Sequence, residues 1–194
     1  MLNHDISNNN VETYIKDIAY KLFNNNILII NNNKYHFTEL EFYFYSAYHQ
    51  DEYCHLKDVK IQNYKSGDFR FHYSGIDLVL LKQNEFICGV LIRGVKKLGK
   101  NIEYINGPLR VLNELCNNLN NLFSSGDNIF KLQKHNNNLN FKISNITRFG
   151  LSDKYSSFKN KEYRYLLIDT IEENQKSYYN SHIKKFLIKK GKLN

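Results

Sequence analysis

The chain has 194 residues, of which 42% are hydrophobic, and a formal net charge of +8 at pH 7. This length suffices for one sizeable core, and no change of composition marks a second one, so we expect a single domain over residues 1–194. No apolar stretch reaches the ~18 residues of a membrane span, and the start lacks the pattern of a signal peptide. We therefore expect a cytoplasmic monomer, which would be nucleoid-associated in a bacterium.

The first half of the chain predicts one helix followed by strands. Apolar residues recur at helical spacing over residues 11–23. Residues 27–30 and 35–45 predict a hairpin around the Asn-rich turn at 31–33, because Asn tolerates left-handed backbone. A polar connection over 49–56, helical at its end, is expected to follow.

The middle and end of the chain predict more strands and two helices. Strands are expected at 69–73, 76–81 and 85–95, so the sheet is mainly antiparallel. Gly107 and Pro108 open a helix predicted over 109–123. Closing strands are expected at 141–146 and 163–168, joined by an irregular link at 148–152, and the tail 176–194 is expected to be a helix with a basic, solvated face. The predicted fold class is α/β (α+β), a single domain with a curved, mainly antiparallel sheet flanked by helices.

The charge balance favours a polyanionic partner, although it does not identify one. The chain has 27 Lys and Arg against 19 Asp and Glu, and such a surplus attracts nucleic acid before specific contacts form. The Asn tracts, however, indicate a compositional bias that can also raise the Lys content without any function. Three widely spaced cysteines form no CxxC pair, so we expect reduced thiols and no metal or cofactor.

Known sequence signatures are missing, but one constellation of acids and aromatics stands out. The chain has no GxGxxG, Walker, HExxH or GxSxG motif, so the sequence gives no support for a nucleotide-cofactor enzyme, a zinc protease of that type or a serine hydrolase. The segment ELEFY, residues 39–43, places Glu39, Glu41 and Tyr43 on one strand face, and DEYCH follows at 51–55. Taken alone, acids on a strand face are more often solvated than functional.

The order of several segments resembles the alkyladenine (3-methyladenine) DNA glycosylase family. The resemblance covers about residues 19–168 and consists of seven segments in unbroken order. They are AYKLFNNNILIINNNKYHFTELEFYF, DEYCH, SGDFRFHYSG, CGVLIRGV, INGPLRVLNEL, TRFGLS and KEYRYLL. Each segment is weak by itself, yet their collinearity is hard to produce by chance.

The resemblance implies a monofunctional glycosylase that hydrolyses the N-glycosidic bond of an alkylated purine. It identifies Glu41 as the general base that activates water, with Glu39 as a supporting acid and Arg93 beside the attacking water. It also implies that Tyr43, His55 and Phe71 clamp the extruded base. No lysine occupies the position of Glu41, so lyase chemistry is not expected.

The same resemblance implies a DNA partner. Tyr73 and Ser74 fall at the family's intercalating position, Arg110 near the DNA backbone and Arg148 in the Arg-x-Gly turn, and Leu151 would present a carbonyl to the water. Two departures weaken the match. Ser74 stands where the family has an intercalating tyrosine, so Tyr73 must substitute or duplex flipping is weak. In addition, Leu80 or Leu81 stands where the family has an asparagine that excludes guanine.

Two alternatives remain open from the sequence. The first is a non-catalytic module that recognises distorted or single-stranded nucleic acid with the same pocket. The second is a glycosylase acting on RNA or on nucleosides, which the serine at position 74 keeps open.

Overall fold

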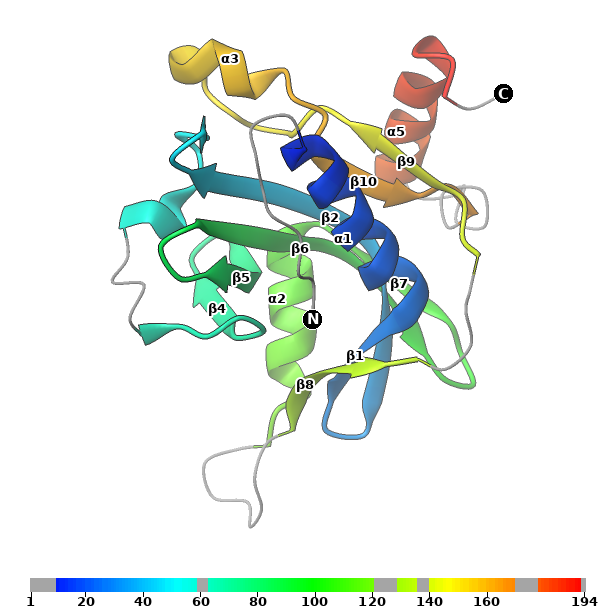
Figure 1. The fold of residues 1–194 in the computed structure, drawn as a ribbon. Helices are drawn as coiled ribbons and strands as arrows, with labels where there is room; N and C mark the ends of the chain where they lie inside the picture. Colours follow the sequence, from blue (N-terminus) through cyan, green and yellow to red (C-terminus); the bar gives the residue numbers. More distant parts are fainter. Residues whose placement is uncertain (1–9, 59–62, 121–128, 136–139, 170–177, 193–194) are drawn as a thin grey trace.

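The computed structural model describes residues 10–58, 63–120, 129–135, 140–169 and 178–192. Its helices flank one curled antiparallel sheet (Figure 1). The helical elements are α1 (Val11–Asn25), η1 (His55–Asp58), α2 (Pro108–Asn117), η3 (Asp153–Tyr155), α3 (Ser156–Lys159) and α5 (Tyr178–Lys189). The strands are β1 (Asn26–Ile30), β2 (Asn33–Ser46), β3 (His49–Gln50), β4 (Phe69–His72), β5 (Gly75–Lys82), β6 (Phe86–Leu98), β7 (Glu103–Asn106), β8 (Phe130–Lys134), β9 (Ile143–Ile146) and β10 (Arg164–Leu167).

Two long strands, β2 and β6, form the centre of the sheet. The main strand order is β4-β5-β6-β2-β1-β8. One edge of β2 pairs with β6 along most of its length, while the other edge pairs with β1 near Tyr35 and with β10 between Glu39 and Glu41. Because β1 and β10 share one edge of the same strand, the sheet branches and curls there.

Because side chains alternate along each strand, one face of the sheet packs against α1 and the other face lies on the side of α2. Helix α1 presents an apolar stripe, and its Tyr14 packs edge-on against Phe44 of β2 and Phe86 of β6. Helix α2 lies on the other side, against β5, β6 and β7 (Figure 1). Residues of odd number on β2, among them Glu41 and Tyr43, therefore point away from α1.

The predicted fold class and most predicted elements are confirmed. Helix α1, the hairpin β1–β2, the pair β4–β5, and strands β6, β9 and β10 lie where the sequence placed them. Asn31 has a φ of 50°, as the turn requires. The C-terminal helix α5 packs Ile183 and Leu187 against β9 and β10 and leaves Lys185 exposed. Among the described residues no helix is both long and apolar enough to cross a membrane.

Several features of the fold differ from the predictions, and the short elements β3, η3 and α3 were not predicted. Helix α2 ends at Asn117, short of the expected position 123, and residues 121–128 lie outside the described part of the chain. Strand β7 was not predicted. Strand β8 was also missed, because its Lys and Gln residues mask the weak alternation of Phe130 and Leu132, which only partly bury against the core.

The irregular pairing of β2 with β6 predicts a steric limit at Gly94. The register shifts between Phe37 and Leu40, and a Cβ added at Gly94 would lie 2.5 Å from Oγ1 of Thr38 and 3.1 Å from Cβ of Glu39. We expect Gly94→Ala to lower the free energy of unfolding by about 1–3 kcal/mol, the usual cost of overpacking. Urea denaturation measures this loss. Gly99→Ala is the matched control, because a Cβ there meets nothing within 4 Å; an equal loss in both variants would contradict the steric explanation.

Candidate functional site

A cavity of about 470 Å³ opens on the sheet face that points away from α1. This volume lies within the range of about 300–1,000 Å³ that is typical of small-molecule sites. Strands β2, β4, β5 and β6, the start of α2, the segment around η1 and the link after β9 contribute to its wall. The lining residues are Tyr43, Tyr53, Cys54, His55, Leu56, Asp58, Arg70, His72, Tyr73, Ser74, Asp77, Gly89, Leu91, Arg93, Pro108, Phe149, Gly150 and Leu151.

Strand pairing sets the floor of the cavity. In one transverse row, Glu41 of β2 pairs with Leu91 of β6, which pairs with Asp77 of β5. In the next row, Tyr43 pairs with Gly89. Paired residues point to the same face of a sheet, so both carboxylates and the tyrosine ring lie on the cavity side. Gly89 has no side chain, and Leu56 covers this part of the floor, because a Cβ added at Gly89 would lie 3.0 Å from Cδ1 of Leu56.

Glu41 lies directly beneath the cavity wall and is 0% exposed. The Tyr43 hydroxyl donates a short hydrogen bond to one carboxylate oxygen. The other oxygen accepts from the backbone N–H of Phe149 at 3.3 Å and lies 3.4 Å from the Arg93 guanidinium. Burial, and after it the Glu41 carboxylate, raises the pKa of Tyr43 well above its ordinary value, so the hydroxyl stays protonated as the donor.

A buried ion-pair network fixes Arg93. Its Nε donates to Oε1 of Glu39 at 2.7 Å, and Nε of Arg164 donates to the same oxygen at 2.6 Å. Two carboxylates and two guanidiniums thus compensate one another beneath the cavity, as buried charges require. Glu39 thus orients the arginine that faces Glu41, and its role as a supporting acid stays a prediction.

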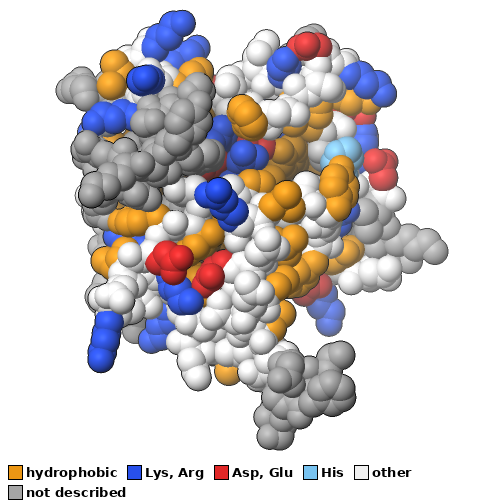
Figure 2. Space-filling view, turned by 180° about the vertical axis from the view of Figure 1, so that it is seen from behind, with side chains coloured by type: hydrophobic (Ala, Val, Ile, Leu, Met, Phe, Trp, Pro, Cys, Tyr) orange, Lys and Arg blue, Asp and Glu red, His pale blue; other side chains and the backbone are white. Residues whose placement is uncertain are grey.

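Two exposed aromatic rings stand at the rim of the cavity. Tyr73, at the turn between β4 and β5, is 90% exposed, and Phe149, in the link after β9, is 68% exposed. Both line the cavity, as does Ser74 beside Tyr73. In the view from behind, hydrophobic side chains gather in a recessed part of the face, with a histidine and several Lys and Arg side chains near it (Figure 2).

The structure brings several predicted residues together. Tyr43, His55, Tyr73, Ser74, Arg93 and Leu151 all line the one cavity, and Glu41 contacts two of them. Arg110 is exposed near the start of α2 and does not line the cavity, although its neighbour Pro108 does. Neither Leu80 nor Leu81 lines it, so the departure from the family's asparagine falls outside the wall.

Arg148 does not lie where a DNA-contacting residue could act. Its side chain is 0% exposed and forms a bidentate ion pair with Asp51, at 2.5 and 3.2 Å, and donates to the carbonyl oxygen of Phe158 at 2.8 Å. Its guanidinium carbon also lies 4.9 Å from the centre of the Tyr43 ring. The prediction of a DNA contact is therefore wrong: Arg148 supports the cavity from beneath, because the link after β9 folds inward.

Phe71 also lies elsewhere than expected. It alternates with Arg70 and His72 on β4, so its ring points to the opposite side of the hairpin and packs against Phe130 of β8 with the ring centres 5.4 Å apart. His72 occupies the cavity side instead. Phe71 therefore does not line the cavity, contrary to the prediction, and His72 lines it in its place.

The sequence analysis missed a charged group on the wall opposite Tyr43. Asp77 is buried, and its oxygens lie 3.2 Å from Nε2 of His72 and 3.3 Å from NH1 of Arg70. The signal was present in the segment GIDLVLL, where one acid interrupts an apolar strand. A carboxylate buried in such a strand needs charged partners, and Arg70 and His72 have the alternate spacing that supplies them.

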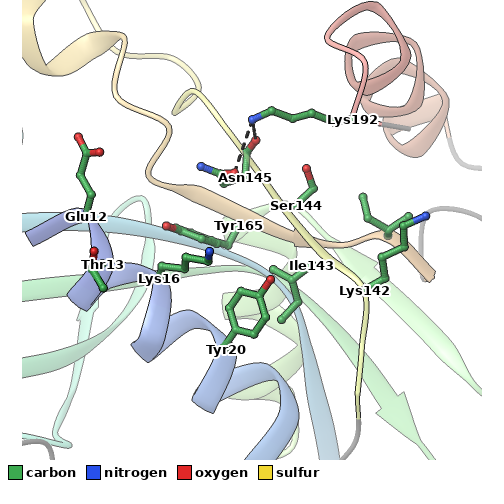
Figure 3. A pocket seen from close by; sticks show the side chains of 11 residues that line it. Glu12, Thr13, Lys16, Tyr20, Lys142, Ile143, Ser144, Asn145, Tyr165 and Lys192 are labelled. Atoms are coloured by element: carbon green, nitrogen blue, oxygen red, sulfur yellow. Dashed lines mark hydrogen bonds between the residues drawn. The ribbon is translucent and has the colours of Figure 1, made fainter. Parts of the chain in front are cut away.

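A second cavity, of about 500 Å³, lies between α1 and the pair β9–β10 (Figure 3). Its wall holds none of the predicted site residues. Lys192 reaches over it and donates to the backbone and side-chain oxygens of Asn145 at 2.5 and 3.5 Å, and it lies 2.5 Å from the carboxylate of Glu162. Among the described residues, no three His, Cys, Asp or Glu side chains gather as a metal site requires.

Comparison with known proteins gives one relative of similar length. A chain of Acanthamoeba polyphaga mimivirus, described as uncharacterized protein L759, is 28% identical over 204 residues, which cover 86% of this chain and 91% of the viral one. No family model matches the chain, and no solved structure matches it significantly. The likeness is therefore to a viral protein whose description states no activity.

Proposed function

We propose that this chain is a monofunctional DNA glycosylase that removes an alkylated purine by hydrolysis. One observation carries the proposal: Glu41 contacts Arg93 and Tyr43, and these two residues line a cavity that His55 and Tyr73 also line. A carboxylate held beside a guanidinium in a covered site is suited to orient water and to stabilise positive charge on the sugar.

In the proposed reaction, water attacks the anomeric carbon of the nucleotide while the bond to the purine nitrogen breaks. The electron pair of that bond leaves with the base, and Glu41 takes a proton from the water. The Arg93 guanidinium, 3.4 Å from the carboxylate, holds Glu41 in position. Glu41 has no exposed surface, so the proposal requires the link that carries Phe149 to move and admit the water.

Aromatic groups in the wall fit the holding of an extruded base. Flipping costs a few kcal/mol, and stacking on an aromatic ring returns about 1–3 kcal/mol per base. Tyr43 is suited to this, because Arg148 covers one face of its ring and its hydroxyl is tied to Glu41. His55, at the first position of η1, is exposed and lines the same cavity.

The test is to identify the bases liberated from alkylated duplex and single-stranded DNA by chromatography. Free 3-methyladenine or 7-methylguanine in the supernatant supports the proposal. If no base is released from any alkylated or deaminated substrate, the proposal fails.

Tyr73 gives a prediction that separates duplex from single-stranded substrate. A wedge is needed only where a stacked duplex must be held open, and Tyr73 is the aromatic at the tip of the β4–β5 turn. We expect Tyr73→Ala to lower base release from duplex DNA by about tenfold, equivalent to one lost stacking contact, and to change release from single strands much less. Tyr48→Ala is the control, because Tyr48 is exposed but does not line the cavity. Equal losses on both substrates would remove the wedge role.

The burial of Glu41 favours a second candidate, a non-catalytic module that binds damaged or single-stranded nucleic acid. Both oxygens of this carboxylate already have partners within the protein, as in a purely structural ion pair. Salt-sensitive binding of DNA without base release would support this function, since phosphate contacts depend strongly on salt.

A further inference from the structure

Asp77 places a hydrogen-bond acceptor in the wall of the cavity, across Gly89 from Tyr43. A Cβ added at Gly89 would lie 3.0 Å from Cδ1 of Leu56 and 3.5 Å from Oδ2 of Asp77, so this carboxylate lies beside Leu56 over the floor at Gly89. Tyr43, Leu56 and Asp77 line the same cavity, so a base held there against the Tyr43 ring would turn one edge toward Asp77.

The neighbours of Asp77 hold it in place. NH1 of Arg70 lies 3.3 Å from Oδ2, and Nε2 of His72 lies 3.2 Å from Oδ1. His72 is held in turn, because its Nδ1 lies 2.9 Å from Oγ of Ser74. Each carboxylate oxygen has two acceptor positions, so the contacts with Arg70 and His72 leave acceptor capacity for a ligand.

We propose that Asp77 reads the edge of the bound base and selects guanine derivatives, above all 7-alkylguanine. This inference rests on the proposed function, because it takes the cavity to hold an extruded purine. Guanine presents two adjacent donors, the ring N1–H and the 2-amino group, and the two oxygens of a carboxylate accept such a pair side by side. Hypoxanthine lacks the amino group, and adenine presents an acceptor at N1, which a carboxylate repels.

Alkylation at N7 strengthens this match. It places a positive charge on the purine ring, so the hydrogen bonds to Asp77 become charge-assisted, and charge-assisted bonds are about twice as strong as neutral ones. The Tyr43 ring adds a cation–π contribution.

The test uses nucleosides as probes, so that recognition is measured without catalysis. Isothermal titration with 7-methylguanosine, guanosine, inosine and adenosine is expected to show the tightest binding for 7-methylguanosine, at least about tenfold tighter than for inosine. Asp77→Asn should weaken 7-methylguanosine binding by about tenfold or more and inosine binding by less than about threefold, because one oxygen becomes a donor. Asp77→Glu, which keeps two acceptors, should retain more of the selectivity than Asp77→Asn.

Asp58→Asn is the matched control, because Asp58 also lines the cavity but lies on η1, away from Arg70 and His72. Urea denaturation of each variant separates loss of binding from loss of folding. The inference is overturned if 7-methylguanosine and inosine bind equally tightly, or if no nucleoside binds. It is also overturned if Asp77→Asn weakens the binding of both nucleosides by the same factor. If Asp77 determines which nucleoside binds but no base is released from DNA, only the glycosylase proposal is contradicted. If bases are released but Asp77 does not affect which nucleoside binds, only this inference is contradicted.

Discussion

Replacing Glu41 by Gln is expected to lower the rate of base release by about 10²–10⁴-fold, the usual contribution of a general base. Gln keeps the shape of the side chain and one acceptor for the Tyr43 hydroxyl, but it cannot take a proton from water. Arg93 keeps its bond to Glu39 at 2.7 Å, so the variant should fold. Single-turnover release of 3-methyladenine and 7-methylguanine measures the effect, and DNA binding should stay within about threefold of the wild type, since the lost step is chemical.

Glu114 provides the matched control for this experiment. It accepts from the hydroxyl of Tyr35 at 2.8 Å and from Lys97 at 2.8 Å, so it repeats the arrangement of a tyrosine, a carboxylate and a cation outside the cavity. Glu114→Gln should leave base release unchanged. If Glu41→Gln releases bases as fast as the wild type, Glu41 has only a structural role.

Arg148→Met is expected to lower the free energy of unfolding by about 3–5 kcal/mol, because it strands the buried Asp51 carboxylate without its partner. Both side chains are 0% exposed, and the guanidinium also binds the carbonyl oxygens of Phe42 and Phe158. Urea denaturation at neutral pH measures the loss.

Lys161→Met is the control for Arg148→Met. It removes an ion pair with Glu12 in which both side chains are exposed, and such pairs contribute about 0–1 kcal/mol. If Arg148→Met unfolds at the wild-type urea concentration but binds DNA more weakly, the original expectation of a DNA contact is restored and the structural role fails.

The sequence predicted the fold class because hydrophobic periodicity is strong where the elements are long. Helix α1 and strands β2 and β6 bury a whole stripe or face, so their patterns are clear. Strand β8 could not be predicted in the same way. It lies at the edge of the sheet beside β1 and leaves Lys131, Gln133 and Lys134 exposed, so its pattern resembles that of a polar loop.

The candidate site was predictable where alternation decides the direction of a side chain. Glu39, Glu41 and Tyr43 share a face of β2, and their common surroundings follow from that. The same rule, applied to β4, places Phe71 opposite His72, so the expected role of Phe71 conflicted with the alternation. Arg148 follows β9 in an irregular link, and no periodic pattern tells whether such a residue turns inward or outward.

The contact of Arg148 with the back of Tyr43 has a consequence for binding. The phenol ring carries a guanidinium 4.9 Å from its centre on one side, and its hydroxyl is anchored on Glu41. A ring held at both its face and its hydroxyl has little side-chain freedom to lose when a planar ligand binds. The entropic cost of association therefore falls mainly on the ligand. A buried charge behind the wall thereby holds in place the aromatic surface on which a planar ligand would stack.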